Sequence, residues 1–463
     1  MPATLKASEN AKSSFREFLS AHRTPILIVL IVACAWRVFL VVGFPRTAGD
    51  EPRYRVPAVN MLAGRGFSSD VREPILPSEH TVPLYPLFIA GLFAVFGQHN
   101  SVVRIAQSVI DLITCLLGSF VAFSLAPSSQ KRAAAMSALI IYGCLCWFTV
   151  SWTRYILTET LATFVTMLAI GVSIMVFRKE VWRWPAVGAI CGAALLLRPD
   201  SLLLVSAFVI FLIFQIARLR TAKSVLSLFL FCLTIPVVLT PWIVRNYIAF
   251  GKFQPLASPT GMPHGEYVPE GYLWWIRTWM TDQTYYLAFH PVLFPGSRSF
   301  DARELPNESF DSSEEREQVL KLIDQYNREG RFTPEMNDQF QAIANNRIKR
   351  APIRFFVWLP IQRMAGMWLT GFATGNALHR LVRILLVLPI LLGGIAGFVF
   401  WTRNAALVTL LLLIISTRTL FFGFVNSDEH YIVEAYPLVI AACGVTCATL
   451  WNYSKRFLRD ELS

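Results

Sequence analysis

The sequence predicts an all-α polytopic membrane protein. Of its 463 residues, 54% are hydrophobic and only 16% are charged, whereas a soluble domain carries about a quarter charged residues. Long apolar runs recur along the chain, and about 20 apolar residues are enough for a helix to cross a bilayer. Several tryptophans stand at the ends of these runs, where aromatic side chains anchor helices at the membrane interface.

The apolar runs give the predicted helices in order. They lie at about 25–43, 101–125, 133–149, 159–177, 185–217, 224–244, 381–401, 405–424 and 432–451. The fifth run is too long for one crossing, and Arg198-Pro199-Asp200 interrupts it. Because a proline and two charges are poorly placed at a bilayer centre, this run predicts two short helices that meet near one face. We expect a bundle of roughly 10–12 transmembrane helices.

Two shorter apolar runs, 83–97 and 352–370, predict helices that lie in the membrane interface. When they are left out of the count, the basic N-terminal segment, the basic loops and the basic C-terminal tail all fall on the cytoplasmic side, as the positive-inside rule requires. We therefore expect both termini to be cytoplasmic, in a cytoplasmic (inner) membrane. The same count places distant polar segments together on the extracytoplasmic face.

Three consecutive parts are expected. Residues 1–244 form an N-terminal transmembrane catalytic module with a first outer loop at 44–100. Residues 245–351 form a small extracytoplasmic helical region, and residues 352–463 hold an interfacial helix and the C-terminal transmembrane helices. In the middle part, serines at 312–313 followed by acids predict a helix start, and Pro334 predicts another helix that runs to Ile348.

The net charge and the cysteines exclude other classes. The formal net charge is +12, which in a membrane protein indicates basic cytoplasmic loops and contact with anionic lipids. Membrane lipids are therefore expected partners, and nucleic acid is not. All eight cysteines lie within apolar runs, which argues against a disulfide framework or a zinc site.

Asp50 and Glu51 are the most informative residues. A pair of carboxylates beside a membrane segment is costly unless water, a partner or a reaction uses it. Arg53 and Arg55 follow closely, and Arg46 precedes them. Acids ringed by cations suit a site that handles an anionic, phosphate-bearing substrate and also needs a base. The plain alternative is a solvated loop with two ordinary acids.

From this loop onward the motifs resemble a known family. The order is DEPRY at 50–54, LAGRGF at 62–67, PLYPLFIA at 83–90 and FG at 96–97. It continues with TETL at 158–161, LRP at 197–199 and PWIVRNY at 241–247. This ordered set resembles the integral-membrane glycosyltransferases of the GT-C class. It is most similar to the bacterial branch related to protein O-mannosyltransferases and the lipid A aminoarabinose transferase, a glycosyltransferase family 39-like group.

The resemblance implies an enzyme that moves a sugar from a polyprenyl-phosphate donor to a lipid, glycan or protein acceptor on the extracytoplasmic face. It implies that Asp50 is the base, that Glu51 is either the base or a positioning group, and that Glu159 is a second acid. A guanidinium binds phosphate bidentately and stays charged, so the expected donor-phosphate ligands are Arg198, Arg245, Arg53 and Arg55. The expected substrate-positioning residues are Tyr54, Tyr85, Asn246 and His430.

Each of these assignments has a plain alternative. Glu159 stands at a helix start and could serve only the helix dipole. Arg198 could snorkel to the interface, and Arg245 could anchor a helix end at the headgroups. The family often shows an Arg-Tyr pair near the C-terminus, but this chain has His430-Tyr431, so His430 stands where an arginine is expected and could be an ordinary loop residue.

The sequence leaves the cofactor and two other functional classes open. Asp50 and Glu159 could hold a divalent cation, Mg²⁺ or Mn²⁺, but no metal is required by the pattern. A lipid or sugar transporter or flippase would be expected to show midplane charges and repeats, and neither is seen in the sequence. A non-catalytic membrane assembly subunit would have dispensable outer acids.

Overall fold

The computed structural model describes residues 15–176, 181–257, 268–281, 288, 290–293, 300–301, 303, 305–370, 377–425 and 428–461. These residues form helices joined by loops, and no strand occurs among them. The fold class predicted from the sequence is therefore confirmed. The chain forms two compact units, one of residues 1–261, 389–417 and 433–463 and the other of residues 262–388 and 418–432.

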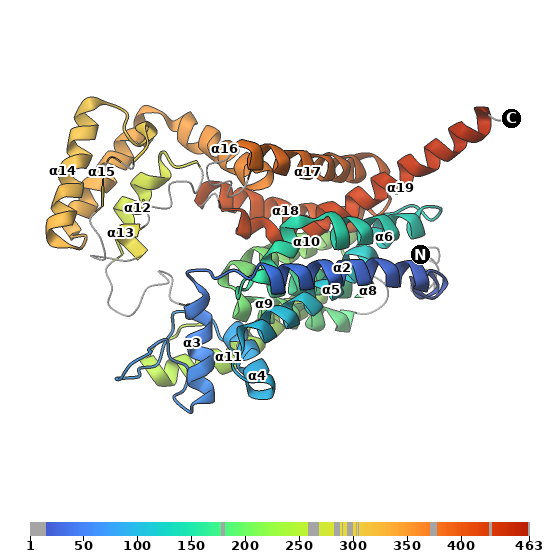
Figure 1. Ribbon diagram of the computed structural model, residues 1–463, viewed down its shortest axis with the longest axis horizontal. Coiled ribbons are helices and arrows are strands. Elements are labelled where there is room, and N and C mark those ends of the chain that lie inside the picture. Colours follow the sequence, from blue (N-terminus) through green and yellow to red (C-terminus); the bar gives the residue numbers. More distant parts are fainter. Residues whose placement is uncertain are drawn as a thin grey trace. The chain divides into compact units, whose positions relative to one another are not determined.

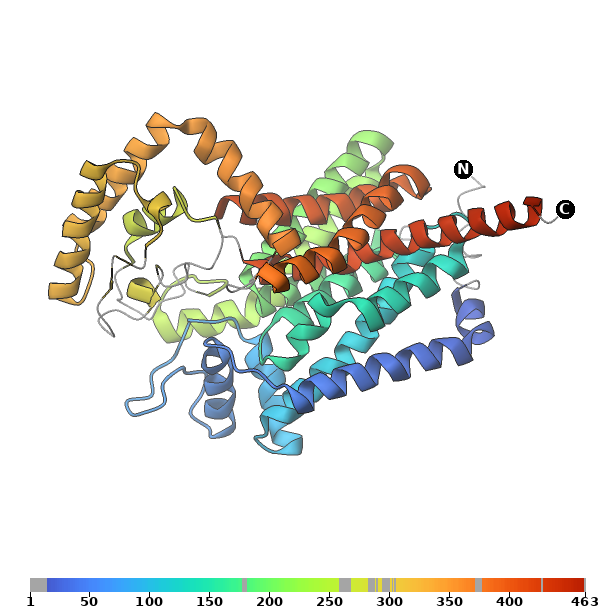
Figure 2. The same ribbon diagram turned by 45° about the horizontal axis from the view of Figure 1, so that its top comes forward.

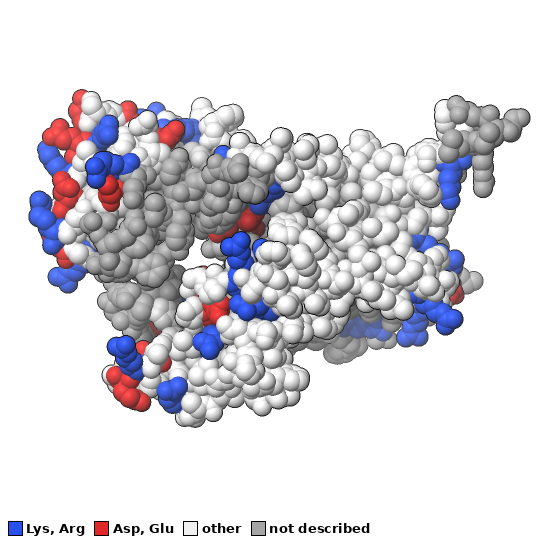
Figure 3. All heavy atoms as spheres, in the orientation of Figure 1, with Lys and Arg blue, Asp and Glu red and all other residues white. Residues whose placement is uncertain are grey.

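The first unit is the larger one and holds most of the long apolar helices. Its main helices are α2 (Arg23–Gly43), α3 (Glu51–Leu62), α4 (Leu84–Phe96), α5 (Asn100–Leu125), α6 (Lys131–Ile140), α8 (Glu159–Val176), α9 (Trp184–Leu197), α10 (Leu202–Leu219), α11 (Ala222–Phe250) and α19 (Tyr436–Glu461). One large apolar core joins α5, α8, α9, α10, α11 and α19 to part of α18 (Ala405–Val425). On the face drawn in Figure 3, the middle of this bundle is almost free of charged side chains, as lipid contact requires.

Seven helices in the described part of the chain are long and apolar enough to cross a membrane, and a bent pair at 131–154 makes an eighth. This number is lower than the predicted 10–12. The difference lies in three shorter apolar helices, Leu84–Phe96, Glu159–Met175 and Trp184–Leu197. The predicted break at Arg198 is confirmed, because α9 ends at Leu197 and a short 3-10 turn (Pro199–Ser201) precedes α10.

The ends of α2 and α19 set the direction of the first unit. The start of α2 and the last residues of α19 lie at the same end, and α3 lies beyond the opposite end of α2 in both views (Figures 1 and 2). At the end with the termini, Arg403 N–H donates to the Leu125 carbonyl and Thr449 donates to Gln130. The start of α2 and the end of α19 are thus on one side of the bundle, and α3 in the first outer loop is on the other.

Close helix contacts in the first unit depend on glycine. A Cβ at Gly188 of α9 would lie 2.5 Å from the Phe231 carbonyl oxygen of α11. A Cβ at Gly397, just after α17 (Ala377–Ala396), would lie 2.2 Å from the Ala442 carbonyl oxygen of α19. These helix pairs can therefore approach only because the glycines have no side chain, which is a common device between membrane helices.

A buried ion pair joins α2 to α5. Arg37 Nε and Nη2 donate to Asp111 Oδ2 at 2.8 and 2.6 Å, and Tyr142 donates to the other carboxylate oxygen at 2.8 Å. Arg37 Nη1 also donates to the carbonyls of Ala33 and Gly143. Gly143 lies in a π-helical turn, Ile141–Leu145, and such turns free carbonyl groups from the helical ladder.

The second unit has a core of its own. Its helices are α12 (Glu270–Arg277), α13 (His290–Leu293), α14 (Ser313–Glu329), α15 (Pro334–Arg350) and α16 (Leu359–Ala365), with π-helical turns at Arg354–Trp358 and Gly366–Thr370. Aromatic residues such as Tyr272, Trp275 and Phe340 fill its core. Both predicted helix starts are confirmed, because Ser312 Oγ accepts from Glu315 N–H and Thr333 Oγ1 accepts from Met336 N–H.

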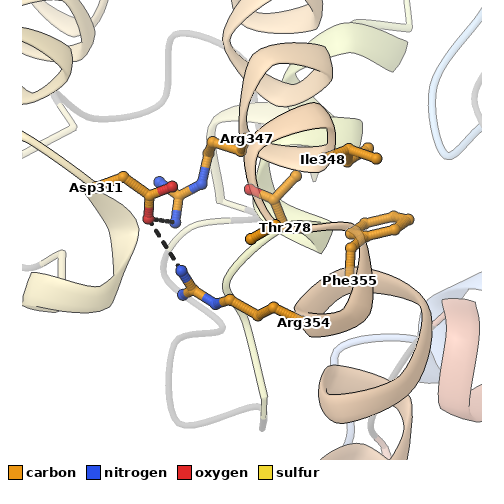
Figure 4. A pocket seen from close by; sticks show the side chains of 7 residues that line it. Thr278, Asp311, Arg347, Ile348, Arg354 and Phe355 are labelled. Atoms are coloured by element: carbon orange, nitrogen blue, oxygen red, sulfur yellow. Dashed lines mark hydrogen bonds and ion pairs between the residues drawn. The ribbon is translucent and has the colours of Figure 1, made fainter.

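A network of ion pairs holds α15 in place within the second unit. Arg347 donates to Glu315, and both Arg347 and Arg354 reach Asp311 (Figure 4). The cavity beside them measures about 10 Å³, which is room for about one water molecule. Burial lowers the pKa of Arg347, although Glu315 and Asp311 oppose this effect. This cluster supports the fold and has no space for a substrate.

The three consecutive parts expected from the sequence differ from the two compact units. The C-terminal helices return to the N-terminal bundle, since residues 389–417 and 433–463 belong to the first unit. The reason is apolar burial: Leu407, Leu410 and Leu438 lie in the same core as α5 and α9.

Candidate active site

The acid pair opens helix α3 at the end of the first unit that lies away from the termini. Asp50 immediately precedes the helix and is exposed, and its side chain does not cap the helix. Glu51 is the first helical residue and is only 5% exposed. Pro52 follows, and a proline in the first turn favours a helix start. The two acids are therefore adjacent in sequence but differ in surroundings.

One oxygen of Glu51 is engaged and the other is not. Glu51 Oε1 accepts a hydrogen bond from Asn100 Nδ2 at 2.7 Å. Arg104 Nη2 lies 4.0 Å from Oε2, but no donor among the described residues makes a hydrogen bond to this buried oxygen. Arg104 also donates to the carbonyls of Arg46 and Arg154, and so it ties the first outer loop to the turn before α8.

Glu159 repeats this arrangement at the start of α8. It is 5% exposed, and its Oε1 accepts from Arg198 Nη1 at 2.9 Å. Its Oε2 is buried, and within the described ranges no donor bonds to it. An anionic side chain in the first turn of a helix is stabilised by the helix dipole. The geometry thus combines the dipole role with an ion pair and leaves one oxygen available.

Two tyrosines link the two glutamates. The rings of Tyr54 on α3 and Tyr85 on α4 meet edge to face with centroids 5.1 Å apart. Burial raises the pKa of Tyr54 to about 12, with Arg53 lowering it and Glu159 raising it further. The charges of Arg198 and Asp50 also act on this hydroxyl. The predicted residues from three distant segments are therefore brought together around Tyr54.

Arg198 lies at the junction of α9 and α10, where the sequence predicts a break. Its Nε and Nη2 bond the two oxygens of Asp200 at 3.0 and 3.2 Å. Burial lowers the pKa of Arg198, but the carboxylates of Asp200, Glu159 and Glu434 together raise it well above its usual value. The raised pKa keeps Arg198 charged. Its side chain is 9% exposed, so it does not snorkel toward solvent.

Arg53 and Arg55 have hydrogen-bonding capacity to spare. Arg53 donates through Nη2 to the His80 carbonyl at 2.6 Å. The Nε atoms of both arginines are buried, and no acceptor in the described parts of the chain bonds to either of them. A cation with an unused donor beside two acids suits an anionic group of a ligand.

Arg245 and Asn246 hold the first outer loop. Arg245 donates to the Ser78 and Phe67 carbonyls at 2.7 and 2.9 Å and stacks on the Trp242 ring. Asn246 is fully buried, and its Nδ2 donates to the Gln254 carbonyl at 2.9 Å. The structure thus gives both residues a part in the fold. Their expected contact with substrate stays a prediction.

His430 lies in the second unit, where its Nδ1 is 2.6 Å from Asp428 Oδ2. Its expected role also stays a prediction. Sequence reasoning missed four polar residues of the first unit: Asn100, Arg104, Asp200 and Glu434. A signal existed for Arg104 and Glu434, since each is a charge inside an apolar run, and such charges are rarely without function.

The metal prediction receives no support from a preformed cluster. In the part of the chain that the structure describes, no group of three or more His, Cys, Asp or Glu side chains is placed to hold a metal ion. Glu159 Oε2 remains an available oxygen, so a divalent cation at Asp50 and Glu159 stays a prediction.

The comparisons with known proteins agree with the resemblance. Residues 79–243 match the model of the dolichyl-phosphate-mannose-protein mannosyltransferase family. This segment is just over a third of the chain, and it contains Tyr85, Glu159 and Arg198. No protein of curated function matches the chain significantly.

Solved structures share the fold. The archaeal oligosaccharyltransferase AglB from Archaeoglobus fulgidus, in complex with an inhibitory peptide and a dolichol-phosphate, matches with a TM-score of 0.53 and 12% identity over 95% of this chain and 52% of that chain. The apo oligosaccharyltransferase from the same organism matches with a TM-score of 0.52 and 12% identity, over 94% of this chain and 51% of that chain. This chain thus spans about half the length of the oligosaccharyltransferases.

ArnT from Cupriavidus metallidurans in the apo state gives a TM-score of 0.41 and 14% identity over 90% of this chain and 77% of that chain, which is too low a score to support an argument. The oligosaccharyltransferase match and the family segment together confirm the resemblance to the GT-C class. The narrower placement in a bacterial branch stays a prediction.

Proposed function

We propose that this chain, which has the fold of the GT-C glycosyltransferases, transfers a sugar from a polyprenyl-phosphate donor to an acceptor on the extracytoplasmic face of a cytoplasmic membrane. The family segment at 79–243 supports the reaction class. The dolichol-phosphate in the similar oligosaccharyltransferase supports the kind of carrier. The acceptor is a hydroxyl of a lipid, a glycan or a protein.

One observation carries the proposal. Glu51 and Glu159 open two different helices, and each keeps one carboxylate oxygen buried without a hydrogen bond among the described residues. Leaving such an atom unsatisfied costs about 1–3 kcal/mol. These two glutamates both act on Tyr85, and a ligand that supplies hydrogen-bond donors there would satisfy both buried oxygens. Sugar and acceptor hydroxyls supply such donors.

The residues divide the chemistry between them. Asp50, exposed at the start of α3, takes the proton of the acceptor hydroxyl. The acceptor oxygen forms its bond to the anomeric carbon while the bond from that carbon to the phosphate oxygen breaks. The phosphate leaves with the electron pair of the broken bond and remains on the polyprenol. Arg53 and Arg55 face the growing negative charge on the phosphate, and Glu51 and Glu159 orient hydroxyl groups.

A divalent cation is a separate part of the proposal. Asp50 and Glu159 would hold Mg²⁺ or Mn²⁺ together with the donor phosphate, since Mg²⁺ is commonly bound by one or two carboxylates and substrate phosphates. No step above depends on it. Transfer that survives a chelator would remove the cation and leave the remaining assignments intact.

The test is sugar transfer by the purified chain in liposomes that contain a radiolabelled polyprenyl-phosphate sugar. Asp50→Asn is expected to lower the transfer rate by about 10²–10⁴-fold, the usual contribution of a general base. Glu159→Gln and Glu51→Gln should also lower it. Asp324→Asn, on the exposed surface of α14, is the matched control and should behave like the wild type.

The same liposomes separate the alternatives. Movement of the labelled lipid across the bilayer without transfer would indicate a flippase. Neither movement nor transfer, with a folded protein, would indicate an assembly subunit. Unchanged transfer in Asp50→Asn would remove the base from its role.

A further inference from the structure

Three carboxylates act on the buried guanidinium of Arg198. The fork formed by Arg198 Nε and Nη2 lies on the two oxygens of Asp200, at 3.0 and 3.2 Å. Nη1 reaches Glu159 through Oε1 at 2.9 Å. Arginine and a carboxylate prefer two parallel hydrogen bonds. Because Asp200 occupies that bidentate edge, Glu159 receives a single bond.

Glu434 is the third carboxylate, and it comes from the far end of the sequence. It is 1% exposed, and its Oε2 accepts from Thr166 Oγ1 of α8 at 2.7 Å. Its charge acts on Arg198 from the segment that leads into α19. Thr166 follows Glu159 by about two helical turns, so both side chains lie on the same face of α8.

This arrangement divides the hydrogen bonds of Arg198 between Asp200 and Glu159. A buried guanidinium with only Glu159 beside it would bind both oxygens of that residue. Asp200 and Glu434 instead pull the positive charge toward themselves. We propose that Asp200 and Glu434 are positioning residues that hold Arg198 away from the second oxygen of Glu159, so that this oxygen stays free to accept a hydrogen bond or a proton from a substrate.

The proposal rests on the proposed function for its role in catalysis, but its geometry can be tested without activity. The groups that act on Glu159 are Arg198 from the α9–α10 junction, Tyr54 from α3 and Tyr85 from α4. Burial raises the pKa of Tyr54 to about 12, so this phenol stays neutral at ordinary pH. The reactivity of Glu159 toward a carboxyl reagent therefore reports how Arg198 is shared.

Dicyclohexylcarbodiimide is the probe. It adds to protonated carboxyl groups in apolar surroundings, and peptide mass spectrometry locates the product. The full chain in nanodiscs is labelled at one fixed pH, as wild type, Asp200→Asn and Glu434→Gln. Both substitutions keep the side-chain shape and remove one charge. Thr166→Val removes only the hydrogen bond to Glu434. Ser173→Ala, lower on α8 and bonded to the Ile170 carbonyl, is the control.

We expect Glu159 to be labelled in the wild type. In Asp200→Asn and Glu434→Gln, the released guanidinium pairs with both oxygens of Glu159, and the extent of labelling should fall by about tenfold, because an opposite charge within reach favours the ionised carboxylate, which the reagent does not modify. Thr166→Val should lower the labelling by less, and Ser173→Ala should leave it unchanged. Labelling that is unchanged or increased in both charge variants would overturn the proposal.

Folding and transfer complete the test. Thermal unfolding shows whether each variant folds, and loss of folding in both charge variants would also overturn the proposal, because it would show a purely structural role. In the transfer assay the folded variants should lose about tenfold in kcat while KM for the donor stays. If labelling falls in both charge variants but the wild type transfers no sugar, only the proposed function is wrong. If the wild type and both charge variants transfer sugar normally and labelling is unchanged, only the positioning role is wrong.

Discussion

At the scale of single residues, the four arginines expected to bind phosphate fall into two groups. Arg198 donates hydrogen bonds to carboxylates within the fold, and Arg245 donates to backbone carbonyls. Arg53 and Arg55 keep buried Nε atoms that no described acceptor uses. Arg53 and Arg55 are therefore the first candidates for phosphate ligands, because they keep N–H donors that the fold does not use.

Lysine substitutions test this ranking, because lysine keeps the charge and loses the planar fork. Arg53→Lys and Arg55→Lys should weaken binding of polyprenyl phosphate by about tenfold and leave the melting temperature unchanged, since neither removes more than one bond within the chain. Arg245→Lys should show the opposite pattern, with a loss of about 2 kcal/mol in stability as the carbonyls of Phe67 and Ser78 lose their donors. Titration with undecaprenyl phosphate and thermal unfolding measure the two effects. Equal loss of binding in all three would refute the ranking.

At the scale of helices, buried polar contacts and glycines decide which helices pair. The Arg37–Asp111 pair is fully enclosed, with side chains 0% and 2% exposed, and each of its members lies in an apolar helix. Breaking a buried pair leaves an uncompensated charge, whereas replacing both members removes the cost of burying them.

Asp111→Asn should therefore destabilise the chain by about 3–5 kcal/mol. The double variant Arg37→Met/Asp111→Leu should recover most of that loss, since neither charge remains to be buried. Denaturant unfolding of the chain in detergent measures both. A double variant that is less stable than Asp111→Asn would show that the pair itself is required.

Gly397→Val tests the contact between α17 and α19. Its Cβ would meet the Ala442 carbonyl oxygen at 2.2 Å, and backbone cannot give way as a flexible side chain can. We expect a loss of about 1–3 kcal/mol from overpacking, seen as a lower melting temperature. Gly91→Val, where a Cβ meets nothing within 4 Å, is the matched control. Equal melting temperatures for the two variants would contradict the packing.

At the scale of the whole molecule, the first unit has a direction. The start of α2 and the end of α19 lie at one end, and α3 lies at the other (Figure 1). Glu159 at the start of α8 acts on Tyr54 of α3. Glu51, Glu159 and Arg198 each stand at the start or the end of a helix. Helix N-termini favour bound anions such as a phosphate, which suits the proposed donor.

Single cysteines at the two ends test this direction in sealed right-side-out vesicles of the cell membrane. Val71→Cys is in the exposed outer loop, and Ser129→Cys is in the exposed loop before α6. A membrane-impermeant maleimide added outside should label Val71→Cys at once, and Ser129→Cys only after the vesicles are opened. The unsubstituted chain, whose cysteines lie in apolar segments, gives the background. Labelling of Ser129→Cys from outside would reverse the orientation and defeat the proposed function.

The sequence by itself determined the class of the molecule and the identity of most site residues. Apolar runs predict helices because a backbone in lipid must bond within its own segment, and Glu159 and Arg198 stood out because charges beside apolar runs need a reason. Only the tertiary structure decided how those charges are used. The division of Arg198 among Glu159, Asp200 and Glu434, and the use of Arg245 to hold a loop, depend on contacts between residues far apart in the chain. Hydrogen bonds depend on distances in space, and the spacing of apolar residues along the sequence does not reveal which distant side chains meet.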